Sequence, residues 1–423
     1  MDRMGLPTEA APWFQSCLLT SRRPRRVGGP LQLLPCSDPG AVALRERAAL
    51  STASTEPMAS QSGNGSTSLA NSGRTAIPQP GHIEALQATA AYLMTPGKGI
   101  LAADETIRTL TKRFEALGIA SNAEFRRSYR EMLFTAPDLA DYISGVILQD
   151  ETIRQNSECG VSMAGLLAGR GILPGIKVDR GAKPLAGYPG ETVTEGLDGL
   201  RERLAEYVKF GAKFAKWRAV IRIGDATPTL ACISANAHAL ARYAALCQEQ
   251  ALLPIVEPEV LMEGAHDIGH CEMVTGAVLE AVFRALYEQG VTLEAVLLKP
   301  SMVIAGQDCA KPASVKQVAA ATLRTLRRHV PAAVPGIVFL SGGQDERLAT
   351  THLNAISNLA GSRPWSISFS YGRALQDPAL NAWRGRSENR TVGREALSFR
   401  ARCNAAASLG TYNDTMEATA HFD

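Results

Sequence analysis

The sequence predicts an α/β protein built as a single-domain (β/α)8 TIM barrel, and two observations carry this prediction. Eight apolar runs of strand length alternate with amphipathic, helix-like segments between residues 99 and 372, close to the roughly 250 residues that such a barrel occupies. Several of the runs also end in charged side chains, which a buried strand has no folding reason to carry. A doubly wound open sheet is the alternative, but the G-x-G-x-x-G turn expected of it is missing.

The strands are expected in this order: GILAA (99–103), ISGVILQ (143–149), LPGIKV (173–178), KFAKWRAVI (213–221), LPIVEPEV (253–260), AVLLKP (295–300), GIVFLSGG (336–343) and WSISFSYG (365–372). Amphipathic helices are expected between them, for example over 197–211, 271–290 and 314–330. A last helix is expected from about 388 to 410. The barrel is therefore assigned to residues 81–410 and a flexible C-terminal tail to 411–423.

The first 80 residues differ in composition from the rest of the chain. They contain several Arg but no Lys, few acidic residues, and a stretch rich in Ser, Thr, Ala and Gly. Such composition is typical of organelle transit peptides, so residues 1–80 are expected to be a disordered leader. The abundance of Ser and Thr favours a plastid (chloroplast) over a mitochondrion. A cytoplasmic protein with a disordered extension is the alternative.

Composition excludes several other classes of protein. The net charge is only +3, and no dense basic stripe is present, so no nucleic-acid partner is expected. No apolar run approaches the roughly 18 residues that a membrane span requires. His266 and His270 have the one-turn spacing of a helical metal site, but they lack the Glu of H-E-x-x-H and an obvious third ligand. Neither a catalytic metal nor a cofactor is expected.

Charged residues follow three of the strands in pairs that are two positions apart: Lys177 with Asp179, Lys216 with Arg218, and Glu257 with Glu259. Residues two apart in a strand point to the same side, and barrel active sites lie at the carboxyl ends of the strands. The residues collected at these ends are Asp104, Glu105, Lys177, Asp179, Lys216, Arg218, Glu257, Glu259, Lys299, Ser341 and Arg373.

Several lysines confined with several carboxylates indicate a particular chemistry. One lysine held neutral by cationic neighbours and partial desolvation becomes a nucleophile toward carbonyl groups. The carboxylates can then transfer protons. The alternative is that the charges form salt bridges that stabilise the barrel mouth, but the full set on four strands makes that explanation insufficient.

Two loops indicate a phosphate site. SGGQ (341–344) follows the seventh strand and SYGR (370–373) follows the eighth. A Ser-Gly-Gly turn exposes backbone N–H groups, and Arg373 adds a fork of donors. The loops after strands seven and eight are the usual phosphate position in this fold.

Together these motifs resemble those of class I fructose-bisphosphate aldolases. The resemblance runs from about residue 80 to about 410 and rests on GKGILAADE, GIKVDRG, AKWR, IVEPEVL, LLKPSM, FLSGGQ and FSYGRALQ, in this order. It implies a metal-independent lyase that reversibly cleaves fructose 1,6-bisphosphate to dihydroxyacetone phosphate and glyceraldehyde 3-phosphate through a Schiff base. This reaction serves glycolysis and gluconeogenesis, and in a plastid the Calvin cycle. The family is usually tetrameric, which implies a homotetramer.

The resemblance also implies roles for individual residues. Lys299 falls on the imine-forming lysine and Glu257 on the general acid/base of carbinolamine dehydration. Asp104 matches the carboxylate that handles the substrate hydroxyl during cleavage, and Lys216 the lysine beside it. The remaining implied positions are supporting residues (Lys177, Arg218, Glu259), the site of the phosphate nearer the ketone (Ser341, Gly342, Gly343, Ser370, Arg373) and the site of the distal phosphate (Arg113).

The sequence departs from the family pattern in two places. After AADE it reads Thr106-Ile107-Arg108-Thr109 instead of an STGS-like run, and Arg108 is hypothesised to assist distal-phosphate binding or to shift substrate preference. The chain ends His421-Phe422-Asp423, without the C-terminal tyrosine of many eukaryotic members. The alternatives to an aldolase are a related Schiff-base transaldolase and a non-catalytic scaffold with the same fold.

Overall fold

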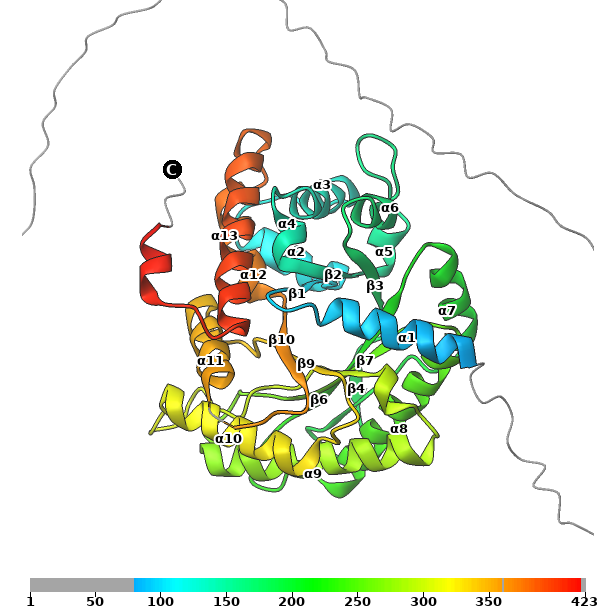
Figure 1. Cartoon of the computed structure of the whole chain (residues 1–423), viewed down its shortest axis with the longest axis vertical. Coiled ribbons are helices and arrows are strands. Elements are labelled where there is room, and N and C mark those ends of the chain that lie inside the picture. Colours follow the sequence, from blue (N-terminus) through cyan, green and yellow to red (C-terminus); the bar gives the residue numbers. More distant parts are fainter. Residues whose placement is uncertain (1–79, 360, 420–423) are drawn as a thin grey trace, which may run out of the picture. The chain divides into compact units, whose positions relative to one another are not determined.

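The eight expected strands form a closed parallel barrel in the computed structural model, which describes residues 80–359 and 361–419 (Figure 1). Around the barrel the order is β1-β10-β9-β8-β7-β6-β3-β2. The strands are β1 (Gly99–Ala103), β2 (Ile143–Leu148), β3 (Leu173–Lys177), β6 (Phe214–Ile221), β7 (Leu253–Val260), β8 (Leu297–Leu298), β9 (Gly336–Phe339) and β10 (Ser366–Tyr371). The predicted (β/α)8 fold is confirmed.

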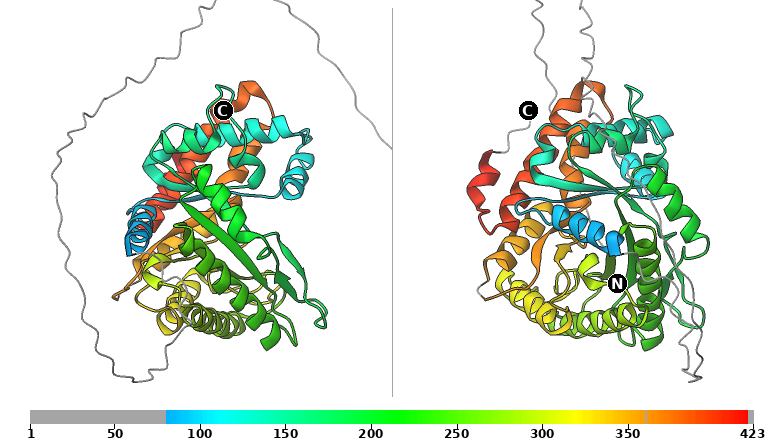
Figure 2. Two further views of the ribbon diagram at one scale, coloured as in Figure 1. Left: turned by 90° about the vertical axis from the view of Figure 1, so that its right-hand side faces the viewer. Right: turned by 45° about the vertical axis from the view of Figure 1, so that its right-hand side comes forward.

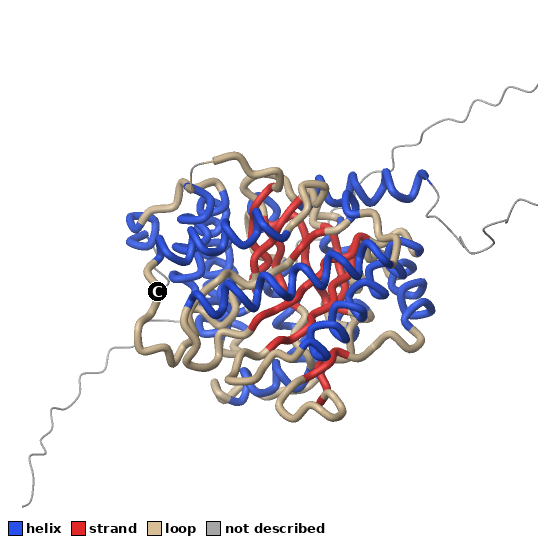
Figure 3. The backbone as a smooth tube through the Cα atoms, turned by 90° about the horizontal axis from the view of Figure 1, so that it is seen from below, coloured by secondary structure: helices blue, strands red, loops and turns tan. Residues whose placement is uncertain are grey.

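Helices surround the strands, as the further views show (Figures 2 and 3). The α-helices are α1 (Pro80–Leu93), α2 (Ile107–Glu115), α3 (Ala123–Phe134), α4 (Leu139–Tyr142), α5 (Asp150–Ile153), α6 (Met163–Ala168), α7 (Leu200–Lys209), α8 (Leu230–Glu249), α9 (Ile268–Glu288), α10 (Val315–His329), α11 (Glu346–Asn358), α12 (Arg373–Trp383) and α13 (Arg390–Ser408). Short 3₁₀ helices are η1 (Leu293–Ala295), η2 (Ser387–Asn389) and η3 (Asp414–Thr419). None of the described helices is long and apolar enough to cross a membrane.

Local sequence explains where the longer helices start. Thr229 precedes α8, and its side chain accepts a hydrogen bond from the backbone N–H of Cys232. Ser314 precedes α10 and forms a capping box with Gln317. Both devices satisfy backbone donors that have no partner within the helix. Each helix therefore begins at a defined point after the loop that leaves the barrel.

One feature that the strand pattern did not predict is a small antiparallel hairpin. It consists of β4 (Ala182–Pro184) and β5 (Thr192–Thr194) and forms a separate two-stranded sheet after β3. All three residues of β4 are exposed. Strands of three residues carry too few apolar positions to show an alternating pattern in the sequence, so the hairpin was missed.

The amino-terminal half of the barrel interior is filled by apolar side chains, among them Ile100, Phe214, Leu253 and Leu297. Glycine makes room for the largest of these side chains. A Cβ on Gly175 would lie only 2.2 Å from the ring of Phe214, closer than any non-bonded carbon contact allows. This half of the barrel is therefore a packed floor beneath the carboxyl ends of the strands.

Helix α1 closes the floor from below. Leu86, Ala90 and Leu93 of α1, together with Met94, are buried in the same cluster as the interior strand residues. The helix crosses the strands in Figure 1. Because one end of the barrel is closed in this way, its polar opening lies at the carboxyl ends of the strands.

The two predicted terminal segments are described only in part. The expected leader over residues 1–80 lies outside the described residues, apart from Pro80 at the start of α1. Within the predicted tail, Glu417 of η3 accepts a 2.6 Å hydrogen bond from the buried Arg400 and a 2.8 Å hydrogen bond from Tyr412. Residues 420–423 lie outside the described part of the chain, including the three C-terminal residues discussed above.

Candidate active site

The charged strand ends continue the interior rows of the barrel. In β6 the inward row runs from Phe214 through Lys216 to Arg218, so an apolar residue gives way to two cations. Parallel register then aligns the rows of neighbouring strands, since Lys177 is paired with Lys216 and Arg218 with Glu257. In-register residues on adjacent strands lie on the same side of the sheet. The charges therefore meet at one end of the barrel.

These residues line a single cavity of about 250 Å³. Of the residues predicted for the site, all line it except Asp179 and Gly343. The Cβ position of Gly343 lies 3.5 Å from Arg373. The full lining is Ala102, Asp104, Glu105, Thr106, Thr109, Arg113, Lys177, Lys216, Arg218, Glu257, Glu259, Lys299, Leu340, Ser341, Gly342, Ser370, Gly372 and Arg373. A larger hollow of about 570 Å³ beside α7 and α8 contains none of them.

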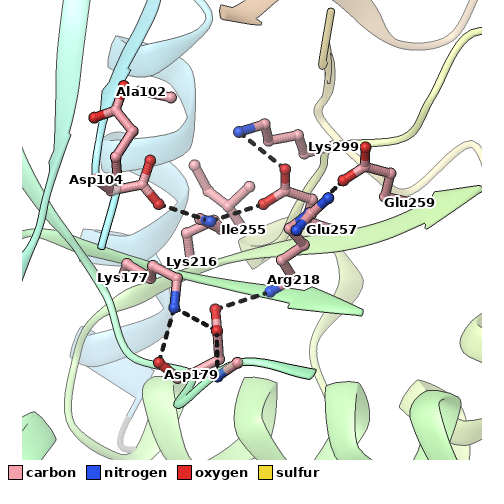
Figure 4. A network of polar contacts seen from close by, with 12 residues as sticks. Ala102, Asp104, Lys177, Asp179, Lys216, Arg218, Ile255, Glu257, Glu259 and Lys299 are labelled. Carbon is pink, nitrogen blue, oxygen red and sulfur yellow. Dashed lines mark hydrogen bonds and ion pairs between the residues drawn. The ribbon is translucent and has the colours of Figure 1, made fainter. Parts of the chain in front are cut away.

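A chain of alternating charges runs through the centre of the cavity (Figure 4). The Nζ atom of Lys216 lies 2.7 Å from a carboxylate oxygen of Asp104 and 3.1 Å from one of Glu257. The other oxygen of Glu257 lies 3.1 Å from Nζ of Lys299. Exposure of these side chains ranges from 4 to 12%, so each charge depends on its neighbours in the chain for compensation.

The chain sets the protonation of its members. Burial opposes ionisation of Asp104, but Lys216 and Lys299 lower its pKa to about 2. Burial also opposes ionisation of Glu257, and the same two lysines nevertheless lower its pKa. Although burial disfavours the charged form of Lys216, Asp104 and Glu257 raise its pKa. Both carboxylates are therefore anions near neutral pH, and Lys216 is a cation between them.

A second group of charges borders the chain. Lys177 is ion-paired with the carboxylate of Asp179 and also donates a 2.9 Å hydrogen bond to its backbone carbonyl. Arg218 is ion-paired with Glu259, and its backbone N–H donates a 3.2 Å hydrogen bond to Asp179. Of the pairs predicted from two-residue spacing, Lys177 and Asp179 thus contact each other directly, whereas Arg218 is paired with Glu259 of the neighbouring strand. Together these contacts form one network across β3, β6 and β7.

The loops after β9 and β10 present hydrogen-bond donors to the cavity. Gly342 and Gly343 adopt φ values of 60° and 90°, which strongly favour glycine. Ser370 is 1% exposed, and its hydroxyl group has no hydrogen-bond partner among the described residues. Arg373 opens α12, so the helix N-terminus also faces the cavity lining. This combination is suited to an anion.

Helix α2 contributes a second polar surface. Thr106 caps the helix by accepting a 3.2 Å hydrogen bond from the N–H of Thr109, and both threonines line the cavity. Arg113, from the last turn of the same helix, also reaches the lining. Arg108 is exposed and is not part of the lining, so the geometry gives no support to the hypothesis that Arg108 assists phosphate binding.

Sequence reasoning missed the network behind Arg113. The guanidinium group of Arg113 lies 2.6 Å from Glu105 and 2.6 Å from Asp377 of α12. Glu105 in turn lies 2.7 Å from the buried Arg130 and accepts a 2.7 Å hydrogen bond from Gln376. Gln376 stands in the FSYGRALQ motif, but Asp377 and Arg130 had no motif to mark them.

A buried histidine supports the Ser-Gly-Gly turn from behind. His352 of α11 is 4% exposed, and its Nδ1 donates a 2.6 Å hydrogen bond to Oε1 of Gln344. Gln344 donates from Nε2 to the carbonyl oxygen of Ser341, at 2.9 Å. Burial lowers the pKa of His352 to about 4. The neutral histidine thus fixes the amide that holds the turn.

The histidine pair noted in the sequence lies elsewhere. His266 and His270 have ring centroids 6.5 Å apart at the start of α9. Neither residue lines the cavity of about 250 Å³. Within residues 80–359 and 361–419, no group of three or more His, Cys, Asp or Glu side chains is arranged to hold a metal ion.

A family model and individual relatives both place this chain with the class I fructose-bisphosphate aldolases. A family model described as fructose-bisphosphate aldolase class-I matches residues 85–422. The chain is 56% identical over 331 residues to a probable fructose-bisphosphate aldolase class 1 of Xanthomonas campestris, which covers 78% of this chain and 99% of that relative. It is 51% identical over 327 residues to fructose-bisphosphate aldolase 4, cytosolic, of Arabidopsis thaliana, which covers 77% of this chain and 83% of the relative.

The fold also matches a solved structure. This is fructose-bisphosphate aldolase from Plasmodium falciparum in complex with TRAP and a small-molecule inhibitor. The sequences are 49% identical, and the TM-score is 0.78. The match covers 79% of this chain and 97% of the other. At this identity the likeness extends beyond the general barrel architecture.

The burial of His352 predicts a pH dependence of stability. The unfolded chain binds a proton at this histidine below about pH 6.5, whereas the folded protein binds it only near pH 4. Between these values the unfolded state holds more protons than the folded state. The contribution of His352 to the free energy of unfolding therefore decreases as the pH falls, by up to about 1.4 kcal/mol per pH unit. Urea unfolding of His352→Gln should show a shallower pH slope than the wild type over this window.

The exposed His82 of α1 provides the matched control. His82→Gln should keep the wild-type slope, because the substitution changes an exposed side chain and no buried one. An unchanged slope for His352→Gln would contradict the assignment of a buried neutral histidine.

Proposed function

The chain belongs to the class I fructose-bisphosphate aldolase family, and on that premise we propose how its cavity reversibly cleaves fructose 1,6-bisphosphate to dihydroxyacetone phosphate and glyceraldehyde 3-phosphate. One observation carries the proposal. Lys299 lies at the end of a buried chain of alternating charges, 3.1 Å from Glu257, in the cavity at the carboxyl end of the barrel. A lysine beside a carboxylate in a desolvated site is suited to imine chemistry.

Lys299 is the nucleophile in this mechanism. Glu257 first accepts a proton from the ammonium group of Lys299. The neutral amine then attacks the ketone carbon of the substrate, a carbon–nitrogen bond forms, and a proton passes from the nitrogen to the ketone oxygen to give a carbinolamine. Glu257 returns the proton it took from Lys299 to the carbinolamine hydroxyl group, which leaves as water, and the protonated imine remains. The distance of 3.1 Å between the two side chains supports this transfer, since proton donors act within hydrogen-bond reach.

Asp104 and Lys216 act in the cleavage step. Asp104 accepts the proton of the substrate's C4 hydroxyl group, and the C3–C4 bond breaks. The electron pair of that bond passes into the imine to give an enamine, and glyceraldehyde 3-phosphate is released as the aldehyde. The low pKa of Asp104, about 2, keeps it available as an anion. Lys216, 2.7 Å away, balances that charge. Protonation and hydrolysis of the enamine release dihydroxyacetone phosphate and restore Lys299.

The remaining residues hold the substrate and its charges. Lys177, Arg218 and Glu259 form the ion-paired border that orients the central chain. The donors of Ser341, Gly342, Gly343, Ser370 and Arg373 bind the phosphate nearer the ketone, and Arg113 contributes to binding of the distal phosphate. The unpartnered hydroxyl of the buried Ser370 supports an anion at this position, because an unsatisfied buried donor is costly unless a ligand uses it.

The complete set of charged groups favours catalysis over a purely structural role. A scaffold with this fold would have no use for a buried chain of four charges, which is expensive to maintain. A transaldolase would not be expected to carry the SGGQ, YGR and EPE motifs in this order. The aldolase reaction belongs to glycolysis and gluconeogenesis.

Compartment and assembly are further parts of the proposal. The family model begins at residue 85, so residues 1–80 precede the shared region, and their composition supports a plastid transit peptide. The plant relatives, in contrast, include cytoplasmic and cytosolic isozymes. A plastid location would place the reaction in the Calvin cycle. The family resemblance supports a homotetramer.

Trapping of the imine tests the central proposal. Borohydride reduction in the presence of dihydroxyacetone phosphate should label the peptide that contains Lys299. The variant Lys299→Met should not be labelled, and its kcat should be at least about 1,000-fold lower than that of the wild type. Lys213→Met, which removes an exposed lysine just before β6, should keep both label and activity. A chelator should have no effect. Label on a different lysine, or inhibition by the chelator, would refute the mechanism.

A reporter fusion tests the leader. Residues 1–80 fused to a fluorescent protein should bring it into plastids of plant cells, whereas residues 81–423 fused to the same protein should remain in the cytosol. Import depends on the basic, acid-poor composition of the leader. Cytosolic or mitochondrial fluorescence of the first fusion would rule out the plastid proposal.

Sedimentation equilibrium tests the assembly. The purified chain of 45.1 kDa should show a mass four times that of the monomer at micromolar concentration, because closed symmetric assemblies are the norm for soluble oligomers. A mass of one or two chains would contradict the tetramer.

A further inference from the structure

The guanidinium group of Arg113, assigned above to the distal phosphate, is already held by two carboxylates. Its Nη1 lies 2.6 Å from Glu105, and its Nη2 lies 2.6 Å from Asp377. Because two carboxylates already neutralise Arg113, its guanidinium group has little net attraction for a third anion such as a phosphate. The inference below therefore rests on the proposed function and concerns how a phosphate gains access to this arginine.

The two carboxylates differ in how firmly they are held. Glu105 is 12% exposed and is also bound to Arg130 and Gln376, so several contacts fix its position. The side chain of Asp377 is 44% exposed, and its carboxylate accepts one 2.6 Å hydrogen bond, from Arg113. The half-exposed partner regains hydration when it leaves. Asp377 is therefore the carboxylate that can give way.

The protonation of the two carboxylates shows the same contrast. Burial disfavours ionised Glu105, but Arg130 and Arg113 lower its pKa. Partial burial raises the pKa of Asp377 in spite of the opposing effects of Arg113 and Arg373. The protein thus stabilises the anion of Glu105 but not that of Asp377. A purely structural ion pair would be expected to stabilise both of its charges.

Asp377 also has a distinctive place on α12. It lies four residues after Arg373, and residues four apart share one face of a helix. Arg373 lines the cavity beside the Ser-Gly-Gly turn, and Arg113 lines it from α2. The carboxylate of Asp377 therefore contacts the cation assigned to the distal phosphate.

We propose that Asp377 is a specificity-determining residue that competes with the distal phosphate for Nη2 of Arg113. When a bisphosphate binds, its distal phosphate displaces the carboxylate of Asp377, while Glu105 continues to hold Nη1. When glyceraldehyde 3-phosphate leaves with that phosphate, Asp377 binds Arg113 again. The competition weakens binding of every ligand with a distal phosphate and leaves ligands without one unaffected.

Steady-state kinetics of Asp377→Asn with two substrates tests this inference. Fructose 1,6-bisphosphate carries the distal phosphate, and fructose 1-phosphate lacks it. The variant should lower KM for the bisphosphate about three- to tenfold, because a competing charge is removed. The ratio of KM for the monophosphate to KM for the bisphosphate should rise by the same factor. Asp377→Ser, which also lacks the charge, should behave in the same way.

A double-mutant cycle tests whether the effect passes through Arg113. In an Arg113→Met background, Asp377→Asn should no longer change the KM ratio, because the contested cation is absent. Glu280→Gln serves as the matched control: it removes one carboxylate from a surface ion pair with Arg284 on α9 and should leave both KM values unchanged.

The outcomes separate this inference from the proposed function. If Arg113→Met changes the KM ratio but Asp377→Asn leaves it unchanged, the competition is refuted and the assignment of Arg113 stands. A higher KM for the bisphosphate in Asp377→Asn would show that Asp377 positions Arg113, and it would equally overturn the inference. If Arg113→Met leaves the ratio unchanged, the distal-phosphate assignment fails and the competition fails with it.

Discussion

The structure depends above all on the alternating charges of Asp104, Lys216, Glu257 and Lys299 inside the barrel. Four nearly buried charges are tolerated only because each cation faces an anion at 2.7–3.1 Å. Removing Lys216 would leave Asp104 without its cation, and removing Glu257 would leave Lys299 without its anion. An unpaired charge in a site shielded from water costs several kcal/mol, on the order of 3–5. The residues of the proposed chemistry are therefore also a condition for a stable barrel mouth.

The rest of the barrel serves to hold this chain in place. Apolar side chains and α1 close the amino-terminal half, so the charges meet water only at the carboxyl end. Parallel register aligns Lys177 with Lys216, and Arg218 with Glu257, across three strands. A shift of one residue in any strand would turn its charged row toward the helices. Closure, register and charge pairing therefore support one another.

The sequence predicts the strands and the side on which their charges lie, but not the partner of each charge. Period two in GIKVD and IVEPE shows which residues share a face, whereas the contact of Lys299 with Glu257 depends on register between β7 and β8. The pairing of Arg113 with Asp377 joins residues 264 positions apart on helices that follow the first and last strands. Only closure of the barrel brings these helices together, so no local pattern announces the pair. The hairpin β4–β5 was missed because strands of three residues are too short to show apolar periodicity.

The two ends of the cavity differ in a way that follows the order of events at Lys299. The Ser-Gly-Gly turn is fixed by Gln344, which the buried His352 holds in turn. In the proposed mechanism the three-carbon fragment with the near phosphate stays covalently attached to Lys299 after cleavage, so a rigid site suits it. The other fragment must leave first, carrying the distal phosphate. At that end the cation is shared with Asp377, a half-exposed carboxylate that can replace the departing phosphate. A firm site holds the attached fragment, and a contested site weakens the hold on the other fragment, so the two fragments can separate in turn after the bond breaks.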